Sequence, residues 1–394
     1  MHRRTFLKNT TLASTAMLAP NFLRFGRQAV NRSGKIFIVI QLSGGNDGLN
    51  TIVPFRNDVY YRERPTLAIA ANEVHPLSDE QGLHPSLAPL RELFDQGHFS
   101  IVNSVGYPNP DRSHFRSMDI WHTASDSDIY LKTGWLGRYL DHQCEGCPNH
   151  EALEMGNGLS LALKGDERRG FVMSQPRVME RANRQPLLQY VAQQTPHDHE
   201  HEQAAYLYKT LVDTQESTGY LLEHSNGRRT RADFPDGPFG RDLRQVAELI
   251  LAGCESRIYY VSLGSFDTHA NQQGQQARLF EQYAQGLQAL AAELQSHQLW
   301  QDTLVMTFSE FGRRVAQNGS RGTDHGTANN LFLAGGSLRQ AGIYNAPPLL
   351  TDLDAGDLRY AIDFRQVYAN VLNDWLGADA GALLGGDFAG LSLI

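Results

Sequence analysis

The sequence predicts an α/β protein built on a largely parallel sheet that helices cover on both faces. Short apolar runs rich in branched residues alternate with longer segments that have the spacing of amphipathic helices. Polar residues follow most of the apolar runs directly, as is typical where the strands of a parallel sheet end. A chain of 394 residues can bury a substantial core, and we expect a single domain over residues 35–394.

The predicted elements follow from composition and spacing. The strand-like runs, each bounded by turn-forming residues, are Ile36–Leu42, Phe99–Val105, Ile258–Leu263, Thr303–Phe308 and Leu331–Ala334. The helix-like segments are Pro85–Asp95, Phe115–Ala124, Arg241–Ala252, Gln275–Gln295 and Phe364–Leu376. This alternation of the two kinds of segment predicts the α/β class.

The stretch from about residue 151 to residue 233 is more polar and has no clear strand in its sequence. We expect it to be a helical or irregular insertion, or a cap, on the α/β core. It contains the run His197-Asp198-His199-Glu200-His201-Glu202, which could bind a metal weakly. Because the run is wholly hydrophilic and follows Pro196, a solvated loop or helix start is the favoured interpretation.

Residues 1–30 have the organisation of an export signal. Two adjacent arginines, Arg3 and Arg4, precede Phe-Leu-Lys, and a mildly apolar stretch of small residues follows from Thr10 to Leu18. This resembles a twin-arginine signal, and the stretch is too short to span a bilayer as a mature helix. We expect the Tat translocase as a partner and a periplasmic or extracellular location. A basic amphipathic surface helix and an uncleaved anchor are the alternatives.

Composition narrows the range of partners. The net charge is −8, and the first thirty residues contain only cations, so the remainder is more acidic still. This negative charge after residue 30 argues against nucleic acid as a partner, although a bound cation would still allow a small anionic substrate. We expect no stable membrane span beyond the signal, and the sequence sets no oligomeric state.

The chain has 3 cysteines. For Cys144 and Cys147 we favour a short-loop disulfide or two free thiols over a zinc site, because only His142 lies near them. Cys254 is expected in the core.

Polar clusters lie where the predicted strands end. They are Ser43–Gly48, Asp111–His114, Gly264–His269 and Ser309–Arg314, with a further cluster, Thr323–Gly326, just before the last strand. In a parallel sheet these ends share one edge, so we expect Asp47, Ser113, Asp267 and Glu310 to converge there. His269 and His325 are expected to join them from loops. Carboxylates and histidines in such a group predict a divalent-cation site.

Each of these positions also has a purely structural interpretation. The alternatives are a tight turn at Gly44–Gly48, a plain helix N-cap at Ser113, a satisfied turn at Asp267 and His269, an ion pair of Glu310 with Arg313 or Arg314, and a buried hydrogen-bonding His325. The shared strand-to-loop placement of all the clusters favours a site.

Several motifs resemble those of one exported bacterial family, the domain of unknown function 1501. They are Ile38–Thr51 (IVIQLSGGNDGLNT), Arg112–Thr123 (RSHFRSMDIWHT), Phe266–Gln272 (FDTHANQ), Thr307–Arg314 (TFSEFGRR) and Gly322–Ala328 (GTDHGTA). The resemblance covers nearly the whole chain. That family in turn resembles the alkaline phosphatase and sulfatase superfamily of metal-dependent ester hydrolases, which implies an alkaline-phosphatase-like core.

The resemblance also implies roles for individual residues. Ser113 matches a serine or threonine nucleophile that becomes phosphorylated. The implied metal ligands are Asp47, Asp267, His269, Glu310, Asp324 and His325. Where the superfamily has an Asp-His pair, this chain has Glu310-Phe311, and phenylalanine cannot bind a metal.

A second metal site would therefore have only oxygen donors, which suits Mg, Mn or Ca better than Zn, or the chain has a single-metal arrangement. We expect one or two divalent ions, with Zn, Mn, Mg and Ca not distinguished. The sulfatases' formylglycine signature is missing from the sequence, which disfavours a sulfatase of that type.

The leading hypothesis is a metal-dependent hydrolase of phosphate or related anionic esters. Ser113 would attack in line, and Arg116 or Arg313 would stabilise the developing charge. The alternative is a non-catalytic binding or assembly module on the same fold, because loss of the Asp-His pair is what a degenerate relative would show. A carbohydrate or lipid hydrolase with paired carboxylates is a weaker alternative, because that chemistry does not need the histidines.

Overall fold

The computed structural model describes residues 34–143, 148–173, 176–193, 202–225 and 229–394. From Lys35 onward the chain forms one compact unit. The predicted signal at residues 1–30, the pair Cys144 and Cys147, and the run from His197 to His201 lie outside the described residues.

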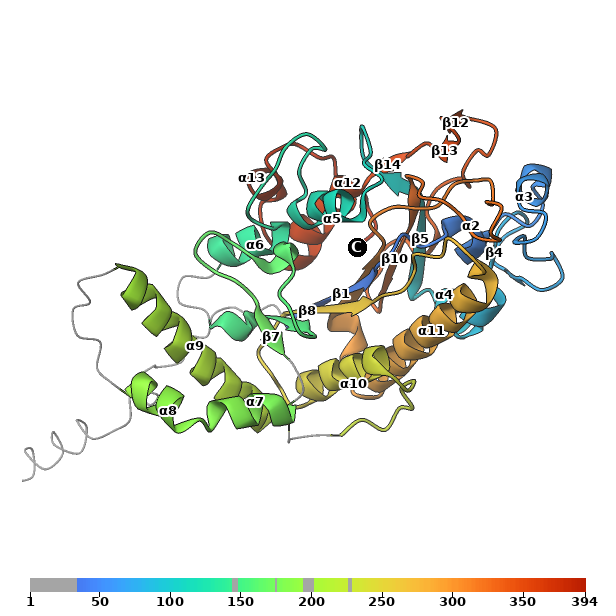
Figure 1. Ribbon diagram of the computed structural model, residues 1–394. Helices are drawn as coiled ribbons and strands as arrows, with labels where there is room; N and C mark the ends of the chain where they lie inside the picture. Colours follow the sequence, from blue (N-terminus) through green and yellow to red (C-terminus); the bar gives the residue numbers. More distant parts are fainter. Residues whose placement is uncertain (1–33, 144–147, 174–175, 194–201, 226–228) are drawn as a thin grey trace, which may run out of the picture. The chain divides into compact units, whose positions relative to one another are not determined.

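A nine-stranded sheet forms the centre, in the order β11-β5-β10-β9-β1-β8-β6-β7, with β14 also paired to β5 (Figure 1). Its strands are β1 (Ile36–Leu42), β5 (Phe99–Gly106), β6 (Ala152–Met155), β7 (Phe171–Met173), β8 (Ile258–Leu263), β9 (Thr303–Phe308), β10 (Asn329–Gly335), β11 (Gly342–Ile343) and β14 (Ile362–Asp363). The fold is therefore mixed α/β with a mostly parallel sheet, as the sequence predicted.

Strand β10 runs antiparallel to both of its neighbours, β5 and β9. The loop before β10 consequently lies at the same edge of the sheet as the loops after the parallel strands. This explains how residues that precede one strand can meet residues that follow the others.

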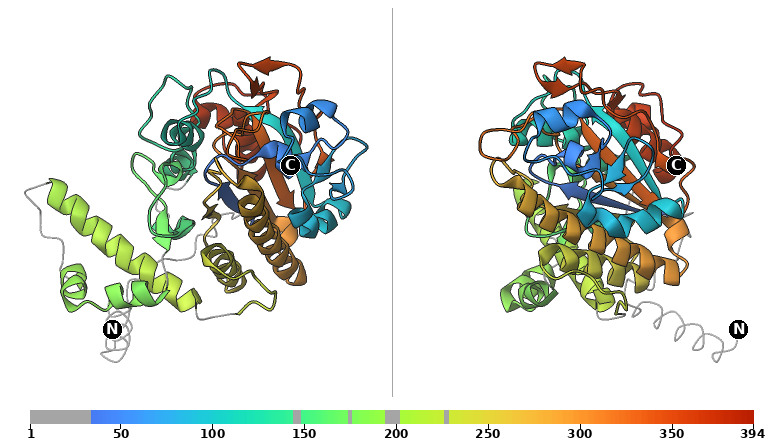
Figure 2. Two further views of the ribbon diagram at one scale, coloured as in Figure 1. Left: turned by 45° about the vertical axis from the view of Figure 1, so that its right-hand side comes forward. Right: turned by 90° about the vertical axis from the view of Figure 1, so that its right-hand side faces the viewer.

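Helices cover both faces of the sheet, and Figure 2 shows the two layers from other sides. The helices are α2 (Gly48–Thr51), α3 (Asp58–Glu63), α4 (Ala88–Asp95), α5 (His114–Thr123), α6 (Trp135–Gln143), α7 (Pro176–Asn183), α8 (Pro186–Gln193), α9 (Glu202–Ser225), α10 (Pro238–Leu251), α11 (Gln272–Ser296), α12 (Phe364–Asn370) and α13 (Ala380–Leu384). A π-helical turn, Val371–Leu376, continues α12. Smaller sheets pair β2 (Ile52–Val53), β3 (His75–Pro76) and β4 (Gly82–Leu83), and β12 (Leu353–Asp354) with β13 (Asp357–Leu358).

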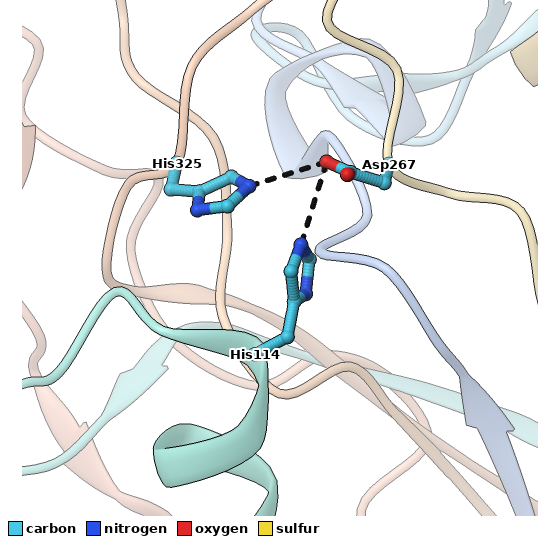
Figure 3. Close-up of side chains that lie close together, drawn as sticks. All are labelled: His114, Asp267 and His325. Atoms are coloured by element: carbon cyan, nitrogen blue, oxygen red, sulfur yellow. Dashed lines mark hydrogen bonds and ion pairs between the residues drawn. The ribbon is translucent and has the colours of Figure 1, made fainter.

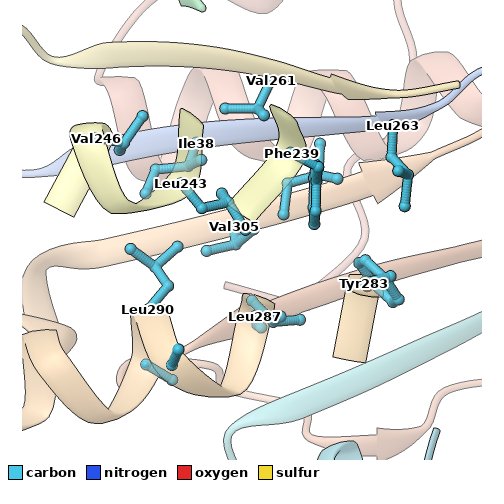
Figure 4. Close-up of a cluster of buried hydrophobic side chains, with 14 of the residues drawn as sticks. Ile38, Phe239, Leu243, Val246, Val261, Leu263, Tyr283, Leu287, Leu290 and Val305 are labelled. Carbon is cyan, nitrogen blue, oxygen red and sulfur yellow. The ribbon is translucent and has the colours of Figure 1, made fainter. Parts of the chain in front are cut away.

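The two-residue period of β1 divides the core into two layers. Ile38 and Ile40 belong to the same buried cluster as side chains of α4, α10 and α11. Figure 4 shows Ile38 with Leu243 of α10 and Leu287 of α11. Phe37 and Val39 point the other way and pack with α5, α6, α12 and α13. Cys254 is buried, as expected, in the first of these layers.

The stretch of residues 151–233 contributes two strands that its sequence did not reveal. β6 pairs with β8, and β7 pairs with β6, so both extend one side of the sheet. Both strands are short, and neither is rich in branched residues, so composition alone gives little strand signal. The helices α7, α8 and α9 follow. Among the described residues, no helix has the length and apolar character needed to cross a membrane.

Shortening one core side chain tests this packing. Leu287 on α11 is fully buried, so Leu287→Ala should lower the free energy of unfolding by about 2–5 kcal/mol. Chemical denaturation measures the change. Leu349, which is 70% exposed, is the matched control, and Leu349→Ala should change it by less than about 0.5 kcal/mol. An equal effect of the two substitutions would contradict the core assignment.

Candidate metal centre

Three side chains from distant parts of the sequence converge at the edge of the sheet where the parallel strands end and β10 begins (Figure 3). His114 is the first residue of α5, Asp267 follows β8, and His325 precedes β10. The Oδ1 atom of Asp267 lies 3.4 Å from Nε2 of His114 and 3.2 Å from Nε2 of His325.

His269 adds a third imidazole to this group. Its Nε2 lies 3.0 Å from Asp267 Oδ1 and 3.0 Å from His325 Nε2. Asp267 and the Nε2 atoms of His114, His269 and His325 are hereafter called the histidine–aspartate cluster. The predicted residues Asp267, His269 and His325 are thus brought together, and His114 joins them.

The opposite nitrogen of each ring is held by an oxygen atom. His114 Nδ1 lies 2.9 Å from Glu310 Oε1, and His325 Nδ1 lies 2.8 Å from the carbonyl oxygen of Arg112. His269 Nδ1 lies 3.3 Å from Asp324 Oδ1. A carbonyl or carboxylate oxygen only accepts, so each Nδ1 carries the hydrogen, and each neutral ring turns the lone pair of Nε2 toward the cluster.

These lone pairs face one another and a carboxylate oxygen. A hydrogen bond between the Nε2 atoms of His269 and His325 would require one ring to carry protons on both nitrogens. His114 Nε2 is buried and has no hydrogen-bond partner among the described residues. The repulsion is relieved by a cation, either a proton on one ring or a metal ion. Imidazoles oriented by outer oxygen atoms are typical of metal sites.

The surroundings keep Asp267 ionised. Partial burial raises the pKa of Asp267, but the hydrogen bond from Arg313 and the charge of its guanidinium act against it, and the pKa falls to about 2. The hydrogen bond to Glu310 raises the pKa of His114, whereas burial lowers the pKa of His325. Asp324, next to His269, has its pKa lowered by a hydrogen bond from Asn318. The carboxylates of the group are therefore available as ligands or acceptors.

Arg313 holds the loops that carry the cluster. Its side chain is fully buried and donates to Asp267 Oδ1 at 2.8 Å. It also donates to the backbone carbonyls of Gly44, Gly45, Phe266 and Thr323. The structure therefore places Arg313 behind Asp267, where it fixes three loops.

Gly44 allows the first of these loops to approach the second. Its φ is +119°, and a Cβ atom there would lie 2.5 Å from the backbone nitrogen of Asp267. Only glycine combines this dihedral with such a close contact.

Two other predicted ligands lie behind the rings they orient. Glu310 is buried and accepts from His114 and from the backbone N–H of Gly44. Asp324 is exposed and accepts from His269 and Asn318.

The structure does not bring Asp47 into the cluster. Its buried carboxylate lies 2.5 Å from Arg64 Nη1 and accepts from Gln272. Arg64 also donates to the side chain of Asn50 and to backbone carbonyls. Asp47 is thus ion-paired through Oδ2, whereas its buried Oδ1 has no hydrogen-bond partner among the described residues.

Arg116 is likewise away from the cluster. Its buried guanidinium donates to the carbonyls of Ser127 and Ile129 and stacks 3.8 Å above the ring of Tyr130. It therefore secures the loop after α5. Ser113, in contrast, is exposed at the N-cap position of α5, directly before His114, and its side chain makes no capping hydrogen bond.

His114 is the site residue that sequence reasoning missed. It belongs to the polar cluster Asp111–His114 after β5, in which the sequence predicted only Ser113, as a nucleophile. Its position at a predicted strand end, like that of Asp267, was the available signal.

Two cavities adjoin Glu310. One, of about 400 Å³, is lined by His114 and Asp267 and opens onto the cluster. The other, of about 420 Å³, lies against Phe311 and is lined by neither Asp267 nor His114. By its lining, the first is therefore the cavity beside the cluster.

Comparisons with known proteins agree with the motif resemblance. The family model described as a protein of unknown function, DUF1501, matches residues 106–384. No curated protein sequence matches the chain.

Matching solved structures include a PsFucS1 sulfatase from Pseudoalteromonas sp., with 10% identity and a TM-score of 0.39, covering 91% of this chain and 70% of that one. A phosphonate monoester hydrolase from Silicibacter pomeroyi has 10% identity and a TM-score of 0.35, covering 90% of this chain and 77% of that one. The lipoteichoic acid synthase LtaP from Listeria monocytogenes has 9% identity and a TM-score of 0.35, covering 79% of this chain and 67% of that one. At these TM-scores the likeness says nothing of what this chain binds.

Metal loading tests the histidine–aspartate cluster. After dialysis against a chelator, adding Zn²⁺ should raise the melting temperature, because an ion at a hundredfold excess over its Kd stabilises the fold by about 2.7 kcal/mol. His114→Ala and His325→Ala should lose this shift and the bound metal in elemental analysis. His297→Ala, which changes a partly exposed histidine at the C-terminal end of α11, should keep both. Equal metal binding by all the variants would rule out the cluster.

Proposed function

This chain belongs to the DUF1501 family, and we propose that it is an exported, metal-dependent hydrolase of phosphate or related anionic esters. The observation that carries the proposal is the convergence of imidazole lone pairs on Asp267, each ring being held by an oxygen atom behind it. A set of oriented donors that leaves no hydrogen to share fits a cation better than a structural hydrogen-bond network.

The donors favour a transition metal, and one ion rather than two. Imidazole nitrogens with a single carboxylate suit Zn or another first-row transition metal better than Mg or Ca. Asp47, the main candidate for a second site, already has the guanidinium of Arg64 as its counter-charge. We therefore assign one ion to His114, Asp267, His269 and His325.

Such an ion would polarise the ester and lower the pKa of the attacking group. The residues of the chain position the other participants. Ser113 presents an exposed hydroxyl at the start of α5, where the positive end of the helix dipole favours an anion. In the proposed reaction its oxygen bonds to phosphorus as the bond to the leaving alcohol breaks, and the serine proton leaves with that alcohol. Water then hydrolyses the phosphoserine.

A binding module on the same fold is the second candidate. Phe311 packs against His114 and His325, with ring centroids 4.8 Å apart in both cases, at the position where the superfamily motif would have a ligand. A metal centre that binds an anionic partner without turnover would retain the cluster and need no Ser113.

Export fits the same proposal. Twin-arginine cargo crosses the membrane folded, so a metal could be inserted in the cytoplasm before transport. We propose that residues 1–30 are the signal recognised by the Tat translocase, and that the mature protein is periplasmic or extracellular.

Replacing the serine separates these alternatives. Ser113→Ala should lower turnover of 4-nitrophenyl phosphate and bis(4-nitrophenyl) phosphate by at least about 10²-fold in the presence of Zn²⁺ or Mn²⁺, since the nucleophile is removed. Metal content should not change. Ser392→Ala, at another exposed serine, is the control and should keep wild-type turnover.

Full turnover by Ser113→Ala, combined with loss of turnover in His325→Ala, would exclude the serine and indicate direct attack by water. Wild-type protein that holds metal and turns over neither ester would favour the binding module.

A further inference from the structure

The cavity beside the histidine–aspartate cluster has a wall that the proposed chemistry does not use. Phe115, Met118 and Asp119 of α5 line it, together with His114, Asp267 and Glu310. Phe115, Met118 and Asp119 are spaced i, i+3 and i+4 on α5, so they share one face of that helix. His114, whose side chain points from the start of α5 toward Asp267 in Figure 3, lies at the end of the same wall.

Phe115 exposes its aromatic ring to this cavity. The residue is 87% exposed, the largest value among the exposed large apolar side chains of the described residues. The next residue along the chain, Arg116, is buried, so α5 packs on the fold through its other face. An aromatic ring that is left bare at the edge of a reaction centre is available to a ligand.

Asp119 places a carboxylate one helical turn further along. It is half-buried, and its carboxylate makes no ion pair or hydrogen bond with any residue that the structure describes. The other acids of this cavity are engaged, since Asp267 contacts Arg313 and Glu310 contacts His114. Asp119 is thus the uncompensated negative charge of the cavity.

A ring and a carboxylate on one helix face form a favourable environment for a cation. The ring face attracts an ammonium group through its quadrupole, and the carboxylate attracts it through its charge. A substrate with only negative charge would be repelled by Asp119. The anionic end of the substrate belongs at the histidine–aspartate cluster, so the cationic end would lie along α5.

The helix sets the axial part of the separation between the two ends. Asp119 follows His114 by five positions, which corresponds to a rise of about 7.5 Å along the helix axis. A short alkyl linker between a phosphate and an ammonium group spans a distance of this order.

We propose that the substrate is a phosphate ester whose alcohol carries an ammonium group, and that Phe115 and Asp119 are the residues that select it. The proposal rests on the proposed function, because it assigns the phosphate to the metal centre. Phe115 and Asp119 act on substrate choice and have no part in the bond-breaking step.

Matched substrates test this selection on the full metal-loaded chain. We would compare 4-nitrophenyl phosphocholine with 4-nitrophenyl 3,3-dimethylbutyl phosphate, an isostere that has a neutral tert-butyl group in place of the trimethylammonium group and the same chromogenic leaving group. The wild type should prefer the cationic ester by about tenfold in kcat/KM, the size expected of a cation–aromatic contact with a nearby carboxylate. Asp119→Asn and Phe115→Ala should each remove most of this preference through KM.

Controls and a binding measurement keep the test decisive. Asp79→Asn and Leu349→Ala remove an exposed acid and an exposed apolar side chain elsewhere, and should keep the preference. Hydrolysis of the dimethylbutyl ester, which lacks the ammonium group, should stay near the wild-type rate in Asp119→Asn, so a general loss of activity points to the proposed function instead.

If neither ester is hydrolysed, titration of metal-loaded protein with phosphocholine and with 3,3-dimethylbutyl phosphate decides the matter. About tenfold tighter binding of phosphocholine, lost in Asp119→Asn, supports the proposal without any turnover. Equal affinities for the two ligands, or an unchanged preference in Asp119→Asn, would overturn it.

Discussion

The buried guanidinium of Arg313 is the interaction on which the arrangement of the site depends. It donates to carbonyls of the loops after β1 and β8 and before β10, and to the carboxylate of Asp267. A charged side chain that is buried away from water is stable only when hydrogen-bond acceptors or an opposite charge surround it. The three loops are therefore coupled, because moving any one of them would take one or more acceptors away from the buried guanidinium. Asp267 is held in place by the same contacts.

Much of the fold could be predicted because its signal is local. Strands β1, β8 and β9 are continuous apolar runs, since both faces of a parallel sheet are buried, and the predicted bounds agree with the structure. The direction of β10 and the pairing of β6 and β7 depend on contacts between distant residues. Short strands such as Phe171–Met173 bury too few side chains to produce a pattern of their own.

For the site, the sequence predicts which loops meet but not which atoms face the centre. Asp47 and Asp267 both follow strands, yet Asp47 turns to Arg64, seventeen positions later in the chain, and Asp267 turns to the histidines. The choice depends on where a counter-charge is buried. Likewise His114 and Ser113 are adjacent, and only the start of α5 determines that the imidazole points inward.

The Glu310-Phe311 pair has a clearer meaning once the geometry is known. Glu310 binds the outer nitrogen of His114, and the ring of Phe311 packs against His114 and His325. The pair thus fixes two rings from behind by a hydrogen bond and by apolar contact, which orients their inner nitrogens. At the position of the superfamily's Asp-His pair, Glu310 and Phe311 therefore hold two rings of the histidine–aspartate cluster. The guanidinium of Arg64 already serves as the cation beside Asp47. The histidine–aspartate cluster is a separate group of donors that could hold a metal ion.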